Sequence, residues 1–196
     1  VTPGLMHLGG DSRQKRWGLG KAGKSHGYVF EVRPEGETKP QPILDMGQFY
    51  HEAVAFDPQT GIAYMTEDTK PQAGLYRFIS NTPGRLHDGG TLEMLRVDTS
   101  ADLAGTLPLN QPMAVDWVKI EDPLKGHTPG THDGAGVVTQ GIEAGGSAFL
   151  SLEGCAYHQG DIYFTSKGGG SAGAGQVFRL DLEKQILELV YEASDK

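Results

Sequence analysis

Three acidic positions carry the strongest chemical signal in this sequence. Glu52 and Glu153 open two similar segments, 52–78 and 153–180, that start about a hundred residues apart. Each segment continues as an apolar run of strand length, a turn, a second run and a third. In the first copy, the acidic pair Glu67-Asp68 ends the second run. Carboxylates held a few ångströms apart repel each other unless one is protonated or a cation lies between them. The pattern therefore suggests a metal site.

The residue types indicate which metals would suit such a site. Glu52 and one member of the Glu67/Asp68 pair lie on two strands joined by a hairpin, so we expect them to be close together. Glu153 would arrive from the repeat copy. Three hard oxygen ligands favour calcium, magnesium, manganese or ferric iron over a metal that prefers thiolate. The alternative is a set of exposed turn carboxylates with no ligand, and the pattern leaves both open.

The elements that must position these residues are hairpin-linked β-strands. The repeat spacing is roughly two blades of a β-propeller, in which the start of each inner strand points at the central axis. An aromatic residue recurs in each expected blade, as in known propellers; these residues are Tyr64, Tyr76, Trp117, Tyr163 and Phe178. We therefore expect an all-β protein, a β-propeller of about three to four blades forming an incomplete ring. Its open edges require self-association, missing chain segments or the 121–147 segment to cover them.

Composition and patterning support a globular all-β chain. With 29 glycines and 11 prolines, the sequence is rich in turn residues, yet its 37% hydrophobic content is enough for a core. We expect an irregular basic lead-in at 1–25 and propeller blades over 26–196, interrupted by a polar, Gly-rich excursion at 121–147. The expected strands outside the two copies are 26–32, 43–46, 91–97, 113–120 and 186–191.

Charge and cysteine content exclude several classes of function. The net charge is −8 although residues 1–25 are basic, and an acidic body argues against nucleic-acid binding. No hydrophobic run reaches membrane-spanning length. Cys155 has no second cysteine to pair with and is expected to be a buried packing residue. No signal peptide is recognisable, and because the first residue is Val1, we expect a processed chain or a fragment.

Two other polar clusters have weaker chemical signals. His127, His132 and Asp133 fall within seven residues and have metal-ligand chemistry, but a solvated loop is the simpler interpretation. The Gly-rich run at 168–175 lacks the Gly-Lys-Ser/Thr ending of a phosphate-binding loop, so we expect a connection between strands. No Gly-x-Ser-x-Gly elbow supports a serine hydrolase.

Several motifs, in order, resemble the PhoX-type alkaline phosphatase family. The first copy supplies Gly47-Gln-Phe-Tyr-His-Glu-Ala-Val-Ala-Phe-Asp-Pro-Gln-Thr-Gly61, Tyr64-Met-Thr-Glu-Asp68 and Leu75-Tyr-Arg-Phe78. The second supplies Phe149-Leu-Ser-Leu-Glu-Gly154, Ile162-Tyr-Phe-Thr-Ser166 and Gly175-Gln-Val-Phe178. The resemblance covers about residues 26–192. It implies an exported β-propeller, periplasmic or secreted, whose central calcium–iron cluster hydrolyses phosphomonoesters. The family's metal-ligand positions correspond here to Glu52, Asp68 and Glu153.

The chain departs from this family at one informative position. The resemblance implies an arginine two residues before the third glutamate, where it would hold the substrate phosphate, and this chain has Ser151 there. Lys167, the repeat equivalent of Asp68, is the nearest candidate substitute. The family's iron-binding cysteine and further acidic ligands lie in segments that this chain does not contain, and Cys155 does not match that cysteine. Two functions remain open: a metal-dependent phosphatase acting on a small phosphorylated substrate, with calcium and possibly iron, or a non-catalytic propeller with structural calcium that binds a partner.

Overall fold

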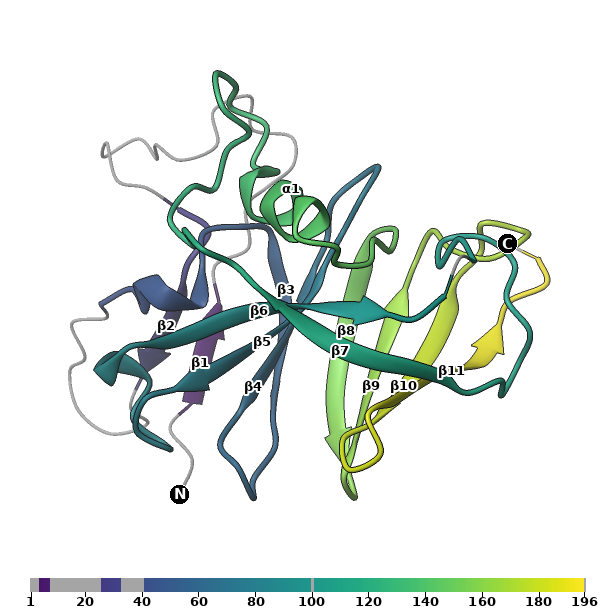
Figure 1. Cartoon of the computed structure of the whole chain (residues 1–196), viewed down its shortest axis with the longest axis horizontal. Helices are drawn as coiled ribbons and strands as arrows, with labels where there is room; N and C mark the ends of the chain where they lie inside the picture. The colour runs from purple at the N-terminus through teal and green to yellow at the C-terminus, as the bar shows by residue number, and fades with distance from the viewer. Residues whose placement is uncertain (1–3, 8–25, 33–40, 100, 196) are drawn as a thin grey trace.

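The computed structural model describes residues 4–7, 26–32, 41–99 and 101–195, and these are almost entirely β-structure (Figure 1). Within them, α1 (Gly136–Glu143) is the one α-helix. The expected basic lead-in at 1–25 lies outside the described residues except for β1 (Gly4–His7). That strand pairs antiparallel with β2 (Val29–Val32).

The first sequence copy and the strand after it form a four-stranded antiparallel meander, which we call blade A. Its strands are β3 (His51–Phe56), β4 (Ala63–Glu67), β5 (Leu75–Ser80) and β6 (Gly90–Val97), and they pair in that order. The turn between β3 and β4 is stabilised by Asp57, whose carboxylate accepts hydrogen bonds from the Gln59 amide and the Thr60 hydroxyl at 3.0 and 2.6 Å. Such local bonds explain why this sequence turns sharply here.

The second copy forms an equivalent meander, blade B. Its strands are β8 (Leu152–His158), β9 (Asp161–Ser166), β10 (Gln176–Asp181) and β11 (Ile186–Glu192). The two-residue loop between β8 and β9 has positive φ at both residues, 49° at Gln159 and 93° at Gly160. Positive φ at both positions matches the right-handed twist of a hairpin, so the loop fixes the register of the two strands.

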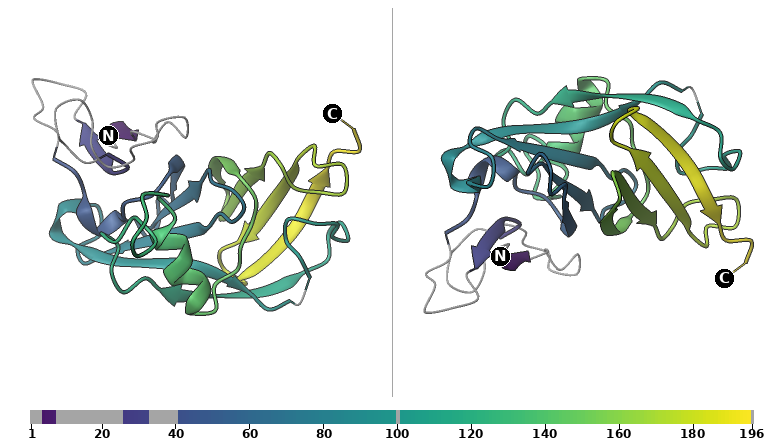
Figure 2. Two further views of the ribbon diagram at one scale, coloured as in Figure 1. Left: turned by 90° about the horizontal axis from the view of Figure 1, so that it is seen from above. Right: turned by 90° about the horizontal axis from the view of Figure 1, so that it is seen from below.

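One strand joins the two blades on their outer side. β7 (Met113–Lys119) pairs antiparallel with β6 of blade A and with β11 of blade B, giving a nine-stranded sheet in the order β3-β4-β5-β6-β7-β11-β10-β9-β8. The two terminal strands of this order, β3 and β8, lie against each other, so the sheet curls until it is nearly closed (Figures 1 and 2). The inner strands of both blades therefore meet along one line.

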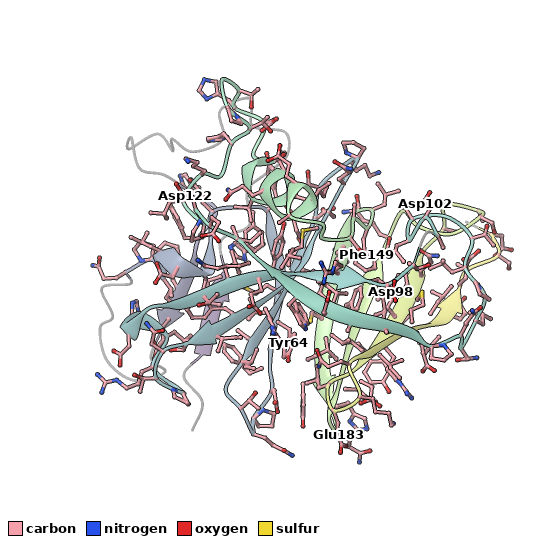
Figure 3. All side chains as sticks on the ribbon, in the orientation of Figure 1. Tyr64, Asp98, Asp102, Asp122, Phe149 and Glu183 are labelled. Atoms are coloured by element: carbon pink, nitrogen blue, oxygen red, sulfur yellow. The ribbon has the colours of Figure 1, made fainter. Side chains whose placement is uncertain are left out.

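Two hydrophobic clusters form the core: one lies between the two blades, and the other lies between blade A and α1. All five residues of β4 are buried, and they alternate between the clusters: Tyr64 faces blade B, whereas Ala63 and Met65 face the cluster under α1. This alternation follows from the two-residue period of a strand. At the centre of the inter-blade cluster, Phe164 and Phe178 stack with ring centroids 5.2 Å apart, and Phe149 meets both edge-on. Figure 3 labels Tyr64 and Phe149 near the meeting of the blades.

Two sequence expectations need correction. Residues 43–46 were expected to form a strand, but Leu44–Met46 is a short 3-10 helix closed by the Gly47 amide, which donates to the Leu44 carbonyl at 3.0 Å. Four apolar residues are too few for periodicity to separate strand from helix. The polar excursion at 121–147 contains α1, whose Val137 and Val138 are buried in the core of blade A.

A buried carboxyl group adds a pH-sensitive element to blade A. Glu67, at the end of β4, is fully buried, and its Oε2 accepts hydrogen bonds from the Gly74 amide at 3.0 Å and the Tyr76 hydroxyl at 2.7 Å. Burial raises the pKa of Glu67 to about 8, against the lowering effect of these two bonds. The folded protein therefore retains a proton on Glu67 that the unfolded chain loses near pH 4.5.

This predicts a specific pH dependence for a Glu67→Gln variant. The stabilising contribution of the Glu67 proton is complete below pH 4.5 and is lost as the pH rises through the folded-state pKa of about 8. Glutamine keeps the acceptor oxygen but cannot ionise. Its free energy of unfolding should exceed the parent's by roughly 2–4 kcal/mol at pH 9 and differ little at pH 4.5. Urea unfolding at both pH values, with exposed Glu183→Gln as control, measures the difference; a gap that does not change with pH would contradict this.

Candidate functional site

Matched irregularities in the two inner strands place the two glutamates. The pairing of β3 with β4 shifts register between His51 and Val54, and that of β8 with β9 shifts between Leu152 and Cys155. In each case two residues oppose one, which is the geometry of a β-bulge. Bulges re-aim side chains and are frequent beside active sites. Glu52 and Glu153 occupy the equivalent positions in the two bulges.

A threonine hydroxyl joins the two bulges across the blade interface. The Thr66 hydroxyl on β4 accepts a hydrogen bond from the Ala53 amide at 3.1 Å, inside the bulge of β3. The same hydroxyl donates to the carbonyl oxygen of Glu153 at 2.5 Å, inside the bulge of β8. The Thr66 side chain is fully buried, and both bonds are partly buried. One side chain therefore sets the spacing between the backbones that carry the two glutamates.

The three carboxylates predicted from sequence come together at this interface. Asp68 directly follows β4, and its amide donates to the Tyr50 carbonyl at 3.0 Å, which holds it beside the start of β3. The pKa of Glu52 is raised, first by burial and then by the negative charges of Glu153 and Asp68. Mutual electrostatic influence of this kind requires close approach. The structure therefore brings Glu52, Asp68 and Glu153 into one cluster, which we call the carboxylate triad.

A lysine lies within the triad. The ammonium nitrogen of Lys167 is 2.5 Å from Asp68 Oδ2 and also donates to Glu153 Oε1. Partial burial acts to lower the pKa of Lys167, but its bonds to the two carboxylates outweigh this effect and raise it. Lys167 follows β9 as Asp68 follows β4, so it arises from the repeat-equivalent position. The sequence named Lys167 only as a candidate substitute for the missing arginine, and its contacts with Asp68 and Glu153 are seen only in the fold.

The donor atoms of the triad are of the type that a hard cation binds. Within the described part of the chain, no three His, Cys, Asp or Glu side chains stand in an arrangement ready to hold a metal ion. Three carboxylates nevertheless supply the oxygen ligands that calcium or ferric iron prefers. The Lys167 ammonium stands in for a cation against two of them. The three carboxylates are therefore suitable ligands for a hard cation. In this structure the Lys167 ammonium provides the positive charge beside them.

A pocket of about 450 Å³ adjoins the triad. Ser151, at the pocket wall, is 1% exposed, adopts a left-handed conformation with φ of 47°, and has a buried hydroxyl without a hydrogen-bond partner among the described residues. A strained backbone and an unsatisfied polar atom are typical of functional sites. The pocket also offers two ammonium groups. Its lining residues are Tyr50, Asp68, Thr69, Lys70, Asp133, Ser151 and Lys167.

The remaining sequence candidates have structural explanations. Asp133 accepts hydrogen bonds from the Ala135 and Thr128 amides, which lower its pKa to about 2 against the raising effect of burial. It therefore organises the 127–135 loop, although it also reaches the pocket beside the triad. Cys155 packs beside the Tyr64 carbonyl, and burial raises the pKa of its thiol to about 12. A larger hollow of about 650 Å³ runs along β6 and β7 and is lined by none of the triad residues.

Comparison with known proteins identifies the family of this chain. The profile of the family described as alkaline phosphatase PhoX matches residues 2–196. The chain belongs to the PhoX alkaline phosphatase family. This is a family of metal-dependent phosphatases, and the resemblance expected from the sequence motifs is confirmed. A search of the curated proteins found no match.

A solved structure confirms the fold of this PhoX-family chain. The structure is of Pseudomonas fluorescens PhoX in complex with vanadate, described as a transition-state analogue. The two share 17% sequence identity with a TM-score of 0.60, and the match covers 84% of this chain. It covers only 35% of the Pseudomonas chain, so this chain spans about a third of the length of that relative. The all-β propeller architecture is thereby confirmed.

Thr66→Val tests whether one hydroxyl holds the two bulges together. Valine keeps the shape but leaves the partly buried Ala53 amide and Glu153 carbonyl without their partner, so we expect a loss of about 1–3 kcal/mol in the free energy of unfolding. Urea denaturation measures it. The repeat-equivalent Thr165→Val is the matched control, since the described residues give the Thr165 hydroxyl no hydrogen bond. Equal losses in both variants would contradict the assignment.

Proposed function

We propose that this chain forms part of a metal-dependent phosphomonoester hydrolase, with Glu52, Asp68 and Glu153 as ligands of a calcium- or iron-type cation. The observation that carries the proposal is the convergence of these carboxylates, delivered by equivalent bulges of two neighbouring blades. Membership of the PhoX family supports the phosphatase class. Because the chain spans about a third of the solved relative, we propose that further chain segments or a second copy supply the remaining ligands and propeller edges.

The residues of this chain have distinct roles in the proposed reaction. A bound hard cation supplies Lewis acidity toward phosphoryl oxygens. Thr66 fixes the distance between the two bulges, and the triad residues hold negative charge at a defined place. The adjoining pocket offers an anionic substrate the ammonium groups of Lys70 and Lys167. Ser151 also lines this pocket, and its buried hydroxyl has no competing partner among the described residues.

Ser151 also favours a second function. Phosphoryl transfer depends on fixed positive charge around the transferring group, and a serine cannot give the bidentate, permanently charged contact of an arginine. A site that binds metal but holds phosphate weakly suits a propeller with structural calcium that binds a partner. We retain this non-catalytic function as the alternative.

The cellular location of the protein is a further part of this proposal. None of the helices in the described ranges has the length and apolar character needed to cross a bilayer. We propose a periplasmic or secreted location because the family resemblance implies export.

Glu52→Gln tests the metal ligands. Removing one anionic oxygen donor weakens a hard-cation site, so we expect the dissociation constant for calcium to rise by roughly tenfold or more. Isothermal titration calorimetry of the metal-free protein measures it. Glu183→Gln is the matched control because Glu183 is exposed at the β10–β11 hairpin, away from the triad (Figure 3). Equal affinity in the parent and Glu52→Gln would remove Glu52 from the ligand set.

Catalysis is tested with a chromogenic phosphate monoester in the presence of calcium and iron. We expect the isolated chain to have weak or no activity, because Ser151 cannot replace a bidentate arginine and ligands from other segments are absent. Turnover of a few per second that is abolished by Glu153→Gln would contradict this expectation and establish catalysis by this chain alone. Measurable activity unaffected by Glu153→Gln would place the chemistry elsewhere.

A further inference from the structure

The Lys167 ammonium occupies the volume that a metal ion would need. Its nitrogen is 2.5 Å from Asp68 Oδ2 and contacts Glu153 Oε1. Calcium binds carboxylate oxygens at about 2.3–2.6 Å. A cation bound to these same two oxygens would therefore coincide with the lysine nitrogen. Lys167 and a metal ion cannot both occupy the triad in this arrangement.

The repeat shows how the lysine reaches this place. Blade A ends its second strand with Thr66, Glu67 and Asp68, and blade B ends the equivalent strand with Thr165, Ser166 and Lys167. Blade A therefore contributes two carboxylates to the cluster, whereas blade B contributes Glu153 and an ammonium. The positive charge is delivered by a strand end that is held as firmly as its carboxylate counterpart, since the Lys167 amide donates to the Ser151 carbonyl at 3.0 Å.

Charge accounts for why the ammonium stays there. Without a cation, the triad gathers three carboxylates at one interface, and carboxylates held close together repel each other. The Lys167 ammonium contacts two of them, Asp68 and Glu153, and a positive charge there favours the ionised carboxylates. A single ammonium thus relieves part of the repulsion among all three carboxylates. A divalent ion would relieve more, and the two cations compete for the same oxygens.

We propose that Lys167 is a built-in counter-cation that competes with the metal ion for the carboxylate triad, so that metal binding requires its ammonium to leave the cluster. This inference rests on the proposed metal site. The adjoining 450 Å³ pocket provides the space for this movement, because Lys167 already lines it. The Lys167 side chain is 48% exposed, so its ammonium can turn toward solvent once its contacts with Asp68 and Glu153 are released.

The first test compares calcium affinity among lysine variants by calorimetry on metal-free protein. Lys167→Met keeps the length of the side chain but removes the charge, and we expect calcium to bind at least about tenfold more tightly. Lys167→Arg keeps the charge and should bind calcium no better than the parent does. Lys184→Met is the matched control, since Lys184 also pairs with a carboxylate, Asp181, but lies away from the triad, and its affinity should stay within about twofold of the parent.

The second test uses the parent protein, so it does not depend on a variant that folds. Brief acetylation followed by mass spectrometry reports the accessibility of each lysine amine. Saturating calcium should increase acetylation of Lys167 by several-fold and leave Lys184 unchanged, because only the Lys167 ammonium is displaced. Unchanged labelling of Lys167 at calcium concentrations shown to bind would overturn the proposal.

The outcomes separate this inference from the proposed function. If the parent binds calcium and Lys167→Met binds it no more tightly, the proposed competition between Lys167 and the metal is contradicted, whereas the proposed metal site is supported. If only Lys167→Met binds calcium, the competition is supported and the parent's metal function fails. If neither binds, both are overturned.

Discussion

The hydrogen bond from the Thr66 hydroxyl to the Glu153 carbonyl is the constraint on which the candidate site depends. It crosses between two blades and connects the bulge of β3 to the bulge of β8. Each bulge places one glutamate at the interface, but neither alone fixes the distance between them. Because Thr66 is fully buried and the bond itself is partly buried, breaking the bond would leave polar groups with little access to water, and this energetic cost maintains the spacing.

Charge balance is the second organising feature of the interface. Repeat symmetry would place four acidic side chains at the ends of equivalent strands, and such a group would be strongly destabilised without a cation. Replacing one of them by Lys167 changes the balance, since the chain then carries its own positive charge. The same substitution explains why the triad resembles a metal site in residue type while no ready metal-holding arrangement exists among the described residues.

Strands with a long alternation of apolar and polar residues were predicted correctly from the sequence, whereas a short apolar run gave a wrong prediction. The strands at 91–97 and 113–120 were predicted closely because alternation extends over seven or eight residues, and the structure has them at Gly90–Val97 and Met113–Lys119. At 43–46 the pattern was too short, and a 3-10 helix stands there. In α1, glycines and polar residues hid a buried face. A Cβ at Gly141 would come too close to Met94 Sδ, so the Met94 side chain would have to move, and this contact exists only in the folded chain.

The sequence by itself determined the all-β class, the two-copy repeat and the candidate residues Glu52 and Glu153, which follow from periodicity and repeat spacing in the linear chain. The choice of Asp68 over Glu67 came from the family resemblance. Only the tertiary structure decided that β3 and β8 lie against each other and that Thr66 joins their bulges. It also placed the Lys167 ammonium among the carboxylates, and it buried the Ser151 hydroxyl beside a pocket. The reason is physical: each of these features depends on residues tens of positions apart, whose contacts form only when the sheet curls and burial makes each polar group find or lose its partner.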